Sequence, residues 1–108
     1  MLKDQKCVPC EGGAEPLKRS EFEQYLAQVS GWNVIEDRLL QREYIFKNFR
    51  EAMVFVNRVA ELAEAEGHHP DMNIHSWNKV EIKLSTHAIG GLSINDFVMA
   101  VKIDALFW

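Results

Sequence analysis

Residues 79–86 read Lys-Val-Glu-Ile-Lys-Leu-Ser-Thr and alternate strictly between polar and apolar or β-branched side chains. Val80, Ile82 and Leu84 share one parity, so a strand here would present one apolar face and one polar face. This alternation is typical of an antiparallel sheet that packs one face on a core and leaves the other face in water. The segment therefore predicts a sheet of that kind.

On either side of this strand, hydrophobic periodicity and breaking residues predict six further elements. Ser20 to Glu23 has the form of a capping box, Asn48 can cap a long helix that ends at Gly67, and Ser93 can cap a last helix. Helices are expected from about 20 to 29, 48 to 66 and 93 onward, and strands at 32–35, 39–46, 73–77 and 79–86. The order α-β-β-α-β-β-α predicts an α+β fold, a four-stranded antiparallel sheet with three helices packed on one face.

The chain has 108 residues, 47% of them hydrophobic and 26% charged, with a net charge of −4. This composition indicates one globular domain, and the absence of a basic stripe argues against direct nucleic-acid binding. No apolar stretch reaches the roughly 20 residues of a membrane span, and the first residues lack a signal-peptide core. We therefore expect a cytoplasmic protein with no membrane partner, comprising a flexible segment over residues 1–16 and a single domain over 17–108.

Cys7 and Cys10 form the only cysteine pair, in the stretch Cys-Val-Pro-Cys. A lone C-x-x-C supplies half of a structural zinc site, which takes four ligands. A thioredoxin-like redox motif would need a preceding strand and a following helix, and the surrounding Lys, Pro and Gly predict neither. The pair therefore receives no functional role.

All four histidines lie within residues 68–87, and the other positions of the chain have none. Imidazole has an unperturbed pKa of about 6.5, which suits proton transfer near neutral pH. His68 and His69 follow the predicted long helix, and His87 follows the predicted strand 79–86, so the three are expected to meet at one end of the sheet. His75 is expected to point outward from a short strand and to take no part.

The histidine cluster also fits two roles that involve no acid–base catalysis. Histidines just beyond a helix can simply interact with its last carbonyl groups and its dipole. Three histidines can also hold a catalytic zinc ion, although the chain has no H-E-x-x-H motif and the adjacent pair would need a loop to bring both rings to one metal.

The spacing of these residues resembles the signature of the pterin-4a-carbinolamine dehydratase family. In that family an acidic residue precedes a His-His-Pro by four positions, and an aromatic residue, a further His and an Asp follow. Here these places are held by Glu64, His68, His69, Pro70, Trp77, His87 and Asp96. The likeness covers roughly residues 15–106, and it departs from the animal members at Ala88, where they carry an acid.

The resemblance implies a lyase that converts a 4a-hydroxytetrahydropterin into a quinonoid dihydropterin and water, in tetrahydrobiopterin recycling, with no cofactor and no metal. It implies that His68 and His87 act as acid and base, in either order, while His69 holds the substrate near its 4a-hydroxyl. Asp96 either orients a catalytic imidazole or only caps the helix that starts at Ser93.

Two of the remaining residues of the signature can each serve in two ways. Glu64 either orients a histidine or is a solvated residue of the last helical turn, and Trp77 either flanks the pterin or belongs to the core. Pro70 is expected to shape the turn that aims the histidines.

The family also allows other functions: a non-catalytic pterin-binding or protein-docking module, as in transcription-cofactor-like relatives, or a role in molybdopterin metabolism. An open sheet edge, apolar helix faces and the apolar end 106–108 predict a homodimer or homotetramer.

Overall fold

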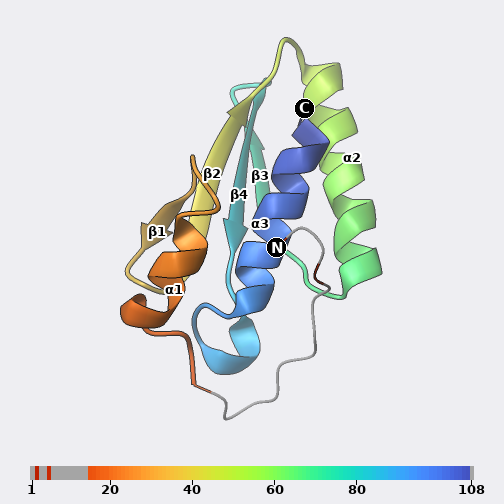
Figure 1. The fold of residues 1–108 in the computed structure, drawn as a ribbon. Coiled ribbons are helices and arrows are strands. Elements are labelled where there is room, and N and C mark those ends of the chain that lie inside the picture. The colour runs from red at the N-terminus through yellow and green to blue at the C-terminus, as the bar shows by residue number, and fades with distance from the viewer. Residues whose placement is uncertain (1, 3–4, 6–14, 108) are drawn as a thin grey trace.

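The sheet has four antiparallel strands in the spatial order β1-β2-β4-β3, in a computed structural model that describes residues 2, 5 and 15–107 (Figure 1). The elements are α1 (Arg19–Leu26), β1 (Asn33–Ile35), β2 (Leu39–Ile45), α2 (Phe49–Glu66), β3 (Asp71–His75), β4 (Lys79–Leu84), the short 3₁₀ turn η2 (His87–Ile89) and α3 (Ile94–Phe107). The predicted α+β fold and its element order are therefore confirmed. Cys7, Cys10 and most of segment 1–16 lie outside the described residues, so those predictions and the domain boundary stay predictions.

Strand β4 is central to the sheet and divides its two faces as the alternation predicts. Val80, Ile82 and Leu84 are fully buried on the helix side, where β2 places Tyr44 and Leu40 opposite Val80 and Leu84. The strand ends two residues earlier than predicted, because Thr86 leaves the ladder and pairs only with Gly91 in an isolated bridge. This early end turns the chain into η2, at the end of the sheet where β4 stops.

Helix α2 begins and ends at the residues that the sequence indicates. The Asn48 side chain accepts a hydrogen bond of 2.8 Å from the Glu51 amide, and Gly67 has a φ of 68° with its amide bonded to the Ala63 carbonyl. The residues that the helix buries recur at helical spacing, at Ala52, Phe55, Val59 and Ala63. The end of α2 is therefore fixed by a left-handed glycine immediately before His68.

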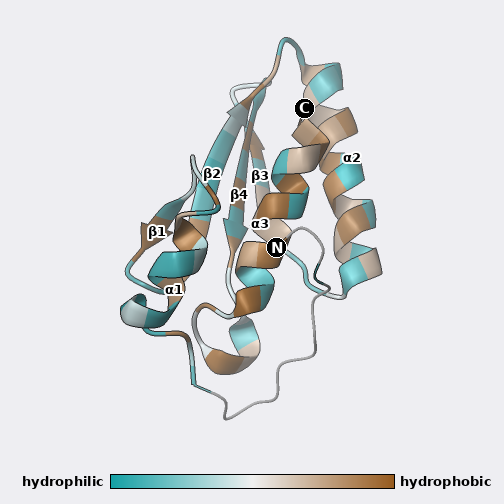
Figure 2. Ribbon diagram, viewed as in Figure 1, coloured by the Kyte–Doolittle hydropathy of each residue, from teal (hydrophilic) through white to brown (hydrophobic). Residues whose placement is uncertain are grey.

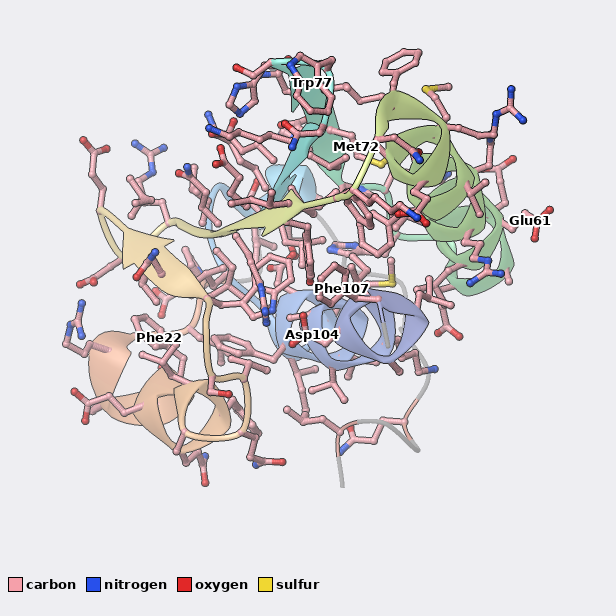
Figure 3. The ribbon with its side chains drawn as sticks, turned by 90° about the horizontal axis from the view of Figure 1, so that it is seen from above. Phe22, Glu61, Met72, Trp77, Asp104 and Phe107 are labelled. Carbon is pink, nitrogen blue, oxygen red and sulfur yellow. The ribbon has the colours of Figure 1, made fainter. Side chains whose placement is uncertain are left out.

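Helix α3 lies between the other two helices and is apolar over much of its surface (Figure 2). Its first turns pack Phe97 against Phe22 of α1, with ring centroids 6.1 Å apart, and its last turn packs Phe107 against Tyr44 at 5.0 Å. A view along the helices shows α1 on one flank of α3 and α2 on the other (Figure 3). None of the helices in the described part of the chain is long and apolar enough to span a membrane.

Two further predicted elements have wrong boundaries: the first helix, which also ends at Leu26 rather than near residue 29, and the strand at 73–77. Helix α1 begins at Arg19 rather than at Ser20, because the Glu21 carboxylate accepts the Lys18 amide at 2.9 Å and makes Lys18 the residue before the first turn. The predicted strand 73–77 instead runs from 71 to 75. Ser76 and Trp77 have φ values of 51° and 56°, so they form the tight turn between β3 and β4.

The Asp104 carboxylate joins α3 to the start of the sheet (Figure 3). It accepts hydrogen bonds from the Trp32 indole at 3.0 Å, from the Arg42 guanidinium at 3.1 Å and from the Tyr44 hydroxyl. Burial, followed by the bond to Asp104, raises the pKa of the Tyr44 phenol, which therefore stays protonated and donates. Donors from three residues on the sheet side thus share one acceptor, and Arg42 also donates to the Ser30 carbonyl at 3.2 Å.

We predict that Asp104→Ala lowers the free energy of unfolding by about 3 kcal/mol, because it leaves the buried Trp32 and Tyr44 donors without their acceptor and Arg42 with only the Ser30 carbonyl. Asp37→Ala is the matched control, since its carboxylate pairs with Arg19 but is 52% exposed. Exposed pairs contribute about 0–1 kcal/mol. Urea unfolding followed by tryptophan fluorescence measures both variants. Equal losses of stability in the two would contradict the anchoring role of Asp104.

Candidate functional site

Three of the four histidines lie at one end of the sheet because β3 and β4 are antiparallel. His68 and His69 come just before β3, and His87 comes just after β4. Since Asp71 at the start of β3 pairs with Lys83 near the end of β4, the segments before and after the hairpin are neighbours. The hairpin register therefore brings together residues that are about twenty positions apart in the sequence.

These segments enclose a cavity of about 250 Å³. Gly67, His68 and His69 form one side of it, and the chain from Ser85 to Ala88, which includes His87, forms the other. We call this the histidine cavity. It is open enough for a ligand to contact imidazole groups from both sides at once.

Asp96 lies beneath the histidine cavity and is fully buried. Its Oδ1 atom is 2.7 Å from Nε2 of His68, and its Oδ2 atom accepts hydrogen bonds of 2.9 Å from both the Thr86 hydroxyl and the Ser93 amide. The Thr86 and Ser93 hydroxyls are themselves 2.7 Å apart. A buried carboxylate needs such donors to offset its lost hydration.

The two expected roles of Asp96 turn out to be compatible within one side chain. One oxygen accepts the Ser93 amide at the start of α3, as in a capping box, and the other accepts from His68. Because an ionised carboxylate only accepts, Nε2 of His68 carries the hydrogen and the lone pair of Nδ1 is left for another group. The His68 side chain is only 12% exposed, so this arrangement is held in place by packing.

His69 has a carboxylate partner of a different kind. Its Nε2 atom is 2.5 Å from Oε2 of Glu64, one turn back on α2, and both side chains are well exposed, at 61% and 78%. Glu64 therefore orients the His69 ring from the solvent side, and neither side chain is buried. Pro70 follows directly and is the last residue before β3.

His87 is the first residue of η2 and is exposed. Among the described residues its ring has no hydrogen-bond or ion-pair partner, which distinguishes it from His68 and His69. Its ring nitrogens are therefore available to a ligand in the histidine cavity.

The structure does not bring Trp77 or His75 to this group. Trp77 lies in the β3–β4 turn, at the opposite end of the hairpin from the histidine cavity, and is 61% exposed (Figure 3). It is neither a wall of the cavity nor part of the core. His75 lies on the open face of the sheet, 2.7 Å from Oε2 of Glu43, as expected for an outward-pointing residue.

Two contributors to the site are not evident from the sequence: Thr86 and Ser93, which donate to the Asp96 carboxylate through the Thr86 hydroxyl and the Ser93 amide. Thr86 reads in the sequence as the last residue of a strand, and Ser93 as a helix cap. The Ser-x-x-Asp spacing is the one signal that links Ser93 to Asp96. Among the residues that the structure describes, no three His, Cys, Asp or Glu side chains are arranged to hold a metal ion.

Comparison with known proteins gives a consistent result. The family described as pterin 4 alpha carbinolamine dehydratase matches residues 15–106. A protein of Rubrobacter xylanophilus, provisionally named a pterin-4-alpha-carbinolamine dehydratase, is 50% identical over 105 residues, 97% of each chain. A protein of Alkaliphilus metalliredigens with the same provisional name is 51% identical over 104 residues, which cover 95% of this chain and 93% of the relative.

A solved structure is also similar along most of its length. The crystal structure described as a transcriptional coactivator/pterin dehydratase from Brucella melitensis superimposes with a TM-score of 0.78 at 32% identity. The match covers 85% of this chain and 98% of that chain.

We predict that the Nε2–H proton of His68 is directly observable by NMR at neutral pH, because its bond to buried Asp96 slows exchange with water. The ring protons of exposed His87 should exchange too fast to be seen. In Asp96→Asn the single amide oxygen would serve Thr86 and Ser93, which turns the NH₂ group toward His68, so the His68 signal should disappear. Equally fast exchange at His68 and His87 in the unmodified protein would contradict this tautomer assignment.

Proposed function

Because the chain belongs to the pterin 4 alpha carbinolamine dehydratase family, we propose that it removes water from a 4a-hydroxytetrahydropterin to give a quinonoid dihydropterin. The reaction would serve the recycling of tetrahydrobiopterin. The single observation that carries this proposal is the histidine cavity, where imidazoles from two segments face the same space and one of them is oriented by a buried carboxylate.

The reaction needs one proton acceptor and one proton donor. A ring nitrogen of the pterin loses its proton, the electrons of that bond form a C=N double bond, and the bond between C4a and the hydroxyl oxygen breaks as the oxygen gains a proton and leaves as water. Neither oxidation nor reduction occurs. Positioned imidazoles can perform both transfers near neutral pH, and such groups typically contribute about 10²–10⁴-fold to the rate.

His68 is our candidate for the base. Its Nε2–H group is held by Asp96, so its Nδ1 lone pair is available to accept the proton of the ring nitrogen. Once protonated, the imidazolium would lie 2.7 Å from a buried carboxylate, which stabilises that charge in the same way as in other histidine–carboxylate pairs.

His87 is our candidate for the acid. It reaches the histidine cavity from the side opposite His68, and no protein group among the described residues competes for its ring. His69, held by Glu64, would bind the substrate near its 4a-hydroxyl. The two faces of the cavity would thus supply the base and the acid separately, and we infer that the chain's own side chains supply all the chemistry that the dehydration needs.

A second candidate function is protein docking without catalysis. The related structure from Brucella melitensis is described both as a transcriptional coactivator and as a pterin dehydratase. The oriented His68–Asp96 pair favours catalysis, because a docking surface has no need of a buried carboxylate beneath a histidine. A measurement of the dehydration rate separates the two functions.

We predict that His68→Ala and His87→Ala each lower kcat by about 10²–10⁴-fold, the usual contribution of an acid or base. Stopped-flow absorbance with a synthetic 4a-hydroxytetrahydropterin and a chelator in the buffer measures the rate above the uncatalysed background. His75→Ala is the matched control, since it removes a histidine on the open face of the sheet and should keep the rate of the unmodified protein.

A loss of less than a few-fold in both His68→Ala and His87→Ala would contradict the acid and base assignment. A protein that gives no acceleration above background, with its fold intact by circular dichroism, would contradict the dehydratase proposal and favour docking.

A further inference from the structure

The hydroxyl groups of Thr86 and Ser93 are linked beneath the histidine cavity, and the carboxylate at the end of this link sets its direction. The Thr86 hydroxyl lies 2.9 Å from Oδ2 of Asp96 and 2.7 Å from the Ser93 hydroxyl. Because an ionised carboxylate only accepts, the single hydrogen of the Thr86 hydroxyl points to Asp96. The Ser93 hydroxyl must therefore donate its own hydrogen to the Thr86 oxygen.

This series of donors begins in the first turn of α3. The Asn95 amide donates to the Ser93 hydroxyl oxygen at 3.2 Å, so donation runs from Asn95 to Ser93, then to Thr86 and finally to Asp96. All four residues are buried, and Thr86 is only 4% exposed. Hydrogen bonds that point in one direction polarise one another, and they are stronger where water is excluded. We call the Ser93 and Thr86 hydroxyls the hydroxyl chain.

The hydroxyl chain acts on His68 through Asp96. Oδ2 of Asp96 accepts from the Thr86 hydroxyl and from the Ser93 amide, and Oδ1 lies 2.7 Å from Nε2 of His68. Two donors on one oxygen restrict rotation of the carboxylate about its bond to Cβ, so Oδ1 stays directed at the imidazole. Without the Thr86 hydroxyl, Oδ2 would keep a single donor, and the hold of the carboxylate on His68 would weaken.

The main chain of Thr86 is held independently of its hydroxyl. Its amide donates to the Gly91 carbonyl at 2.7 Å, and its carbonyl accepts from the Ile89 amide at 3.2 Å, so these bonds close the turn that begins with His87. Pro16 lies against the outer side of this turn, where a Cβ added to Gly91 would be only 2.7 Å from the Pro16 side chain. Loss of the hydroxyl alone should therefore leave the turn and His87 in place.

We infer that Thr86 is a positioning residue for His68, an inference that rests on the proposed role of His68 as the base. The hydroxyl hydrogen of Thr86 is given to Asp96 and its oxygen accepts from Ser93, so this group is engaged within the protein. Its contribution is to fix the imidazole before the substrate arrives. Such a residue affects the rate of proton transfer rather than the binding of the substrate.

Thr86→Val tests this inference, because valine keeps the β-branched shape and the main-chain bonds and removes the hydroxyl. We expect kcat to fall about 10–100-fold, as for the loss of one hydrogen bond to a charged group, while KM stays nearly unchanged. Thr86→Ser keeps the hydroxyl and should recover most of the lost rate. Ser20→Ala removes an exposed hydroxyl on α1, and this matched control should keep the rate of the unmodified protein.

NMR supplies a second measurement that needs no substrate. In Thr86→Val the Nε2–H signal of His68 should move upfield and exchange faster with water, because the bond to Asp96 is held less firmly. Ser93→Ala keeps the Thr86 bond to Asp96 and removes the hydroxyl behind it, so the signal should move in the same direction by a smaller amount. Ser93→Ala thus tests the hydroxyl chain even if Thr86→Val does not fold.

Two results would overturn the inference. One is a His68 signal that stays unchanged in both Thr86→Val and Ser93→Ala. The other is a loss of rate in Thr86→Ser as large as that in Thr86→Val, since the shape of the residue and not its hydroxyl would then matter. If the unmodified protein accelerates no dehydration, the proposed function fails, and the His68 signal still decides whether the hydroxyl chain orients the imidazole.

Discussion

The buried carboxylate of Asp96 is the constraint on which the site depends. Because it has no contact with water, it requires donors, and these come from three separate segments: Thr86 after β4, the Ser93 amide before α3, and His68 after α2. Satisfying one charge therefore fixes the end of a strand, the start of a helix and the orientation of an imidazole. The geometry of the histidine cavity follows from this single set of hydrogen bonds.

Helix α3 carries a second structural carboxylate, Asp104, two turns further on and roughly 12 Å along the axis. Asp104 holds Trp32, Arg42 and Tyr44 at the aromatic end of the molecule, and Asp96 serves the histidine end. The helix thus joins an end that is packed by rings to an end that is open and lined by titratable groups. Because both carboxylates lie on α3, the position of this one helix sets the packing of the aromatic end and the geometry of the histidine end.

The sequence alone predicts the element order, because alternation at residues 79–86 and helical spacing after Asn48 are strong local signals. It fails where local signals are ambiguous. Ser20 has the form of a helix cap, although Lys18 is the residue before the first turn of α1. Trp77 resembles a strand residue, although it occupies a left-handed position in a turn. The histidine cluster is visible in the sequence. The sequence does not show that Asp96 fills both roles at once, because the Ser-x-x-Asp spacing fits capping and orientation equally well. Nor does it show where Trp77 lies, because that depends on which end of the β3–β4 hairpin faces the cavity.

The central place of α3 has a consequence for how the chain acquires its fold during synthesis. This helix leaves the ribosome after every other element described here, yet α1 packs on it through Phe22 and the sheet through Tyr44. Until it arrives, the earlier elements expose an uncovered apolar side to chaperones and proteases. The same helix brings Asp96 to His68, so the core closes and the site forms in the same step. A chain that lacks α3 therefore cannot orient His68 in the histidine cavity.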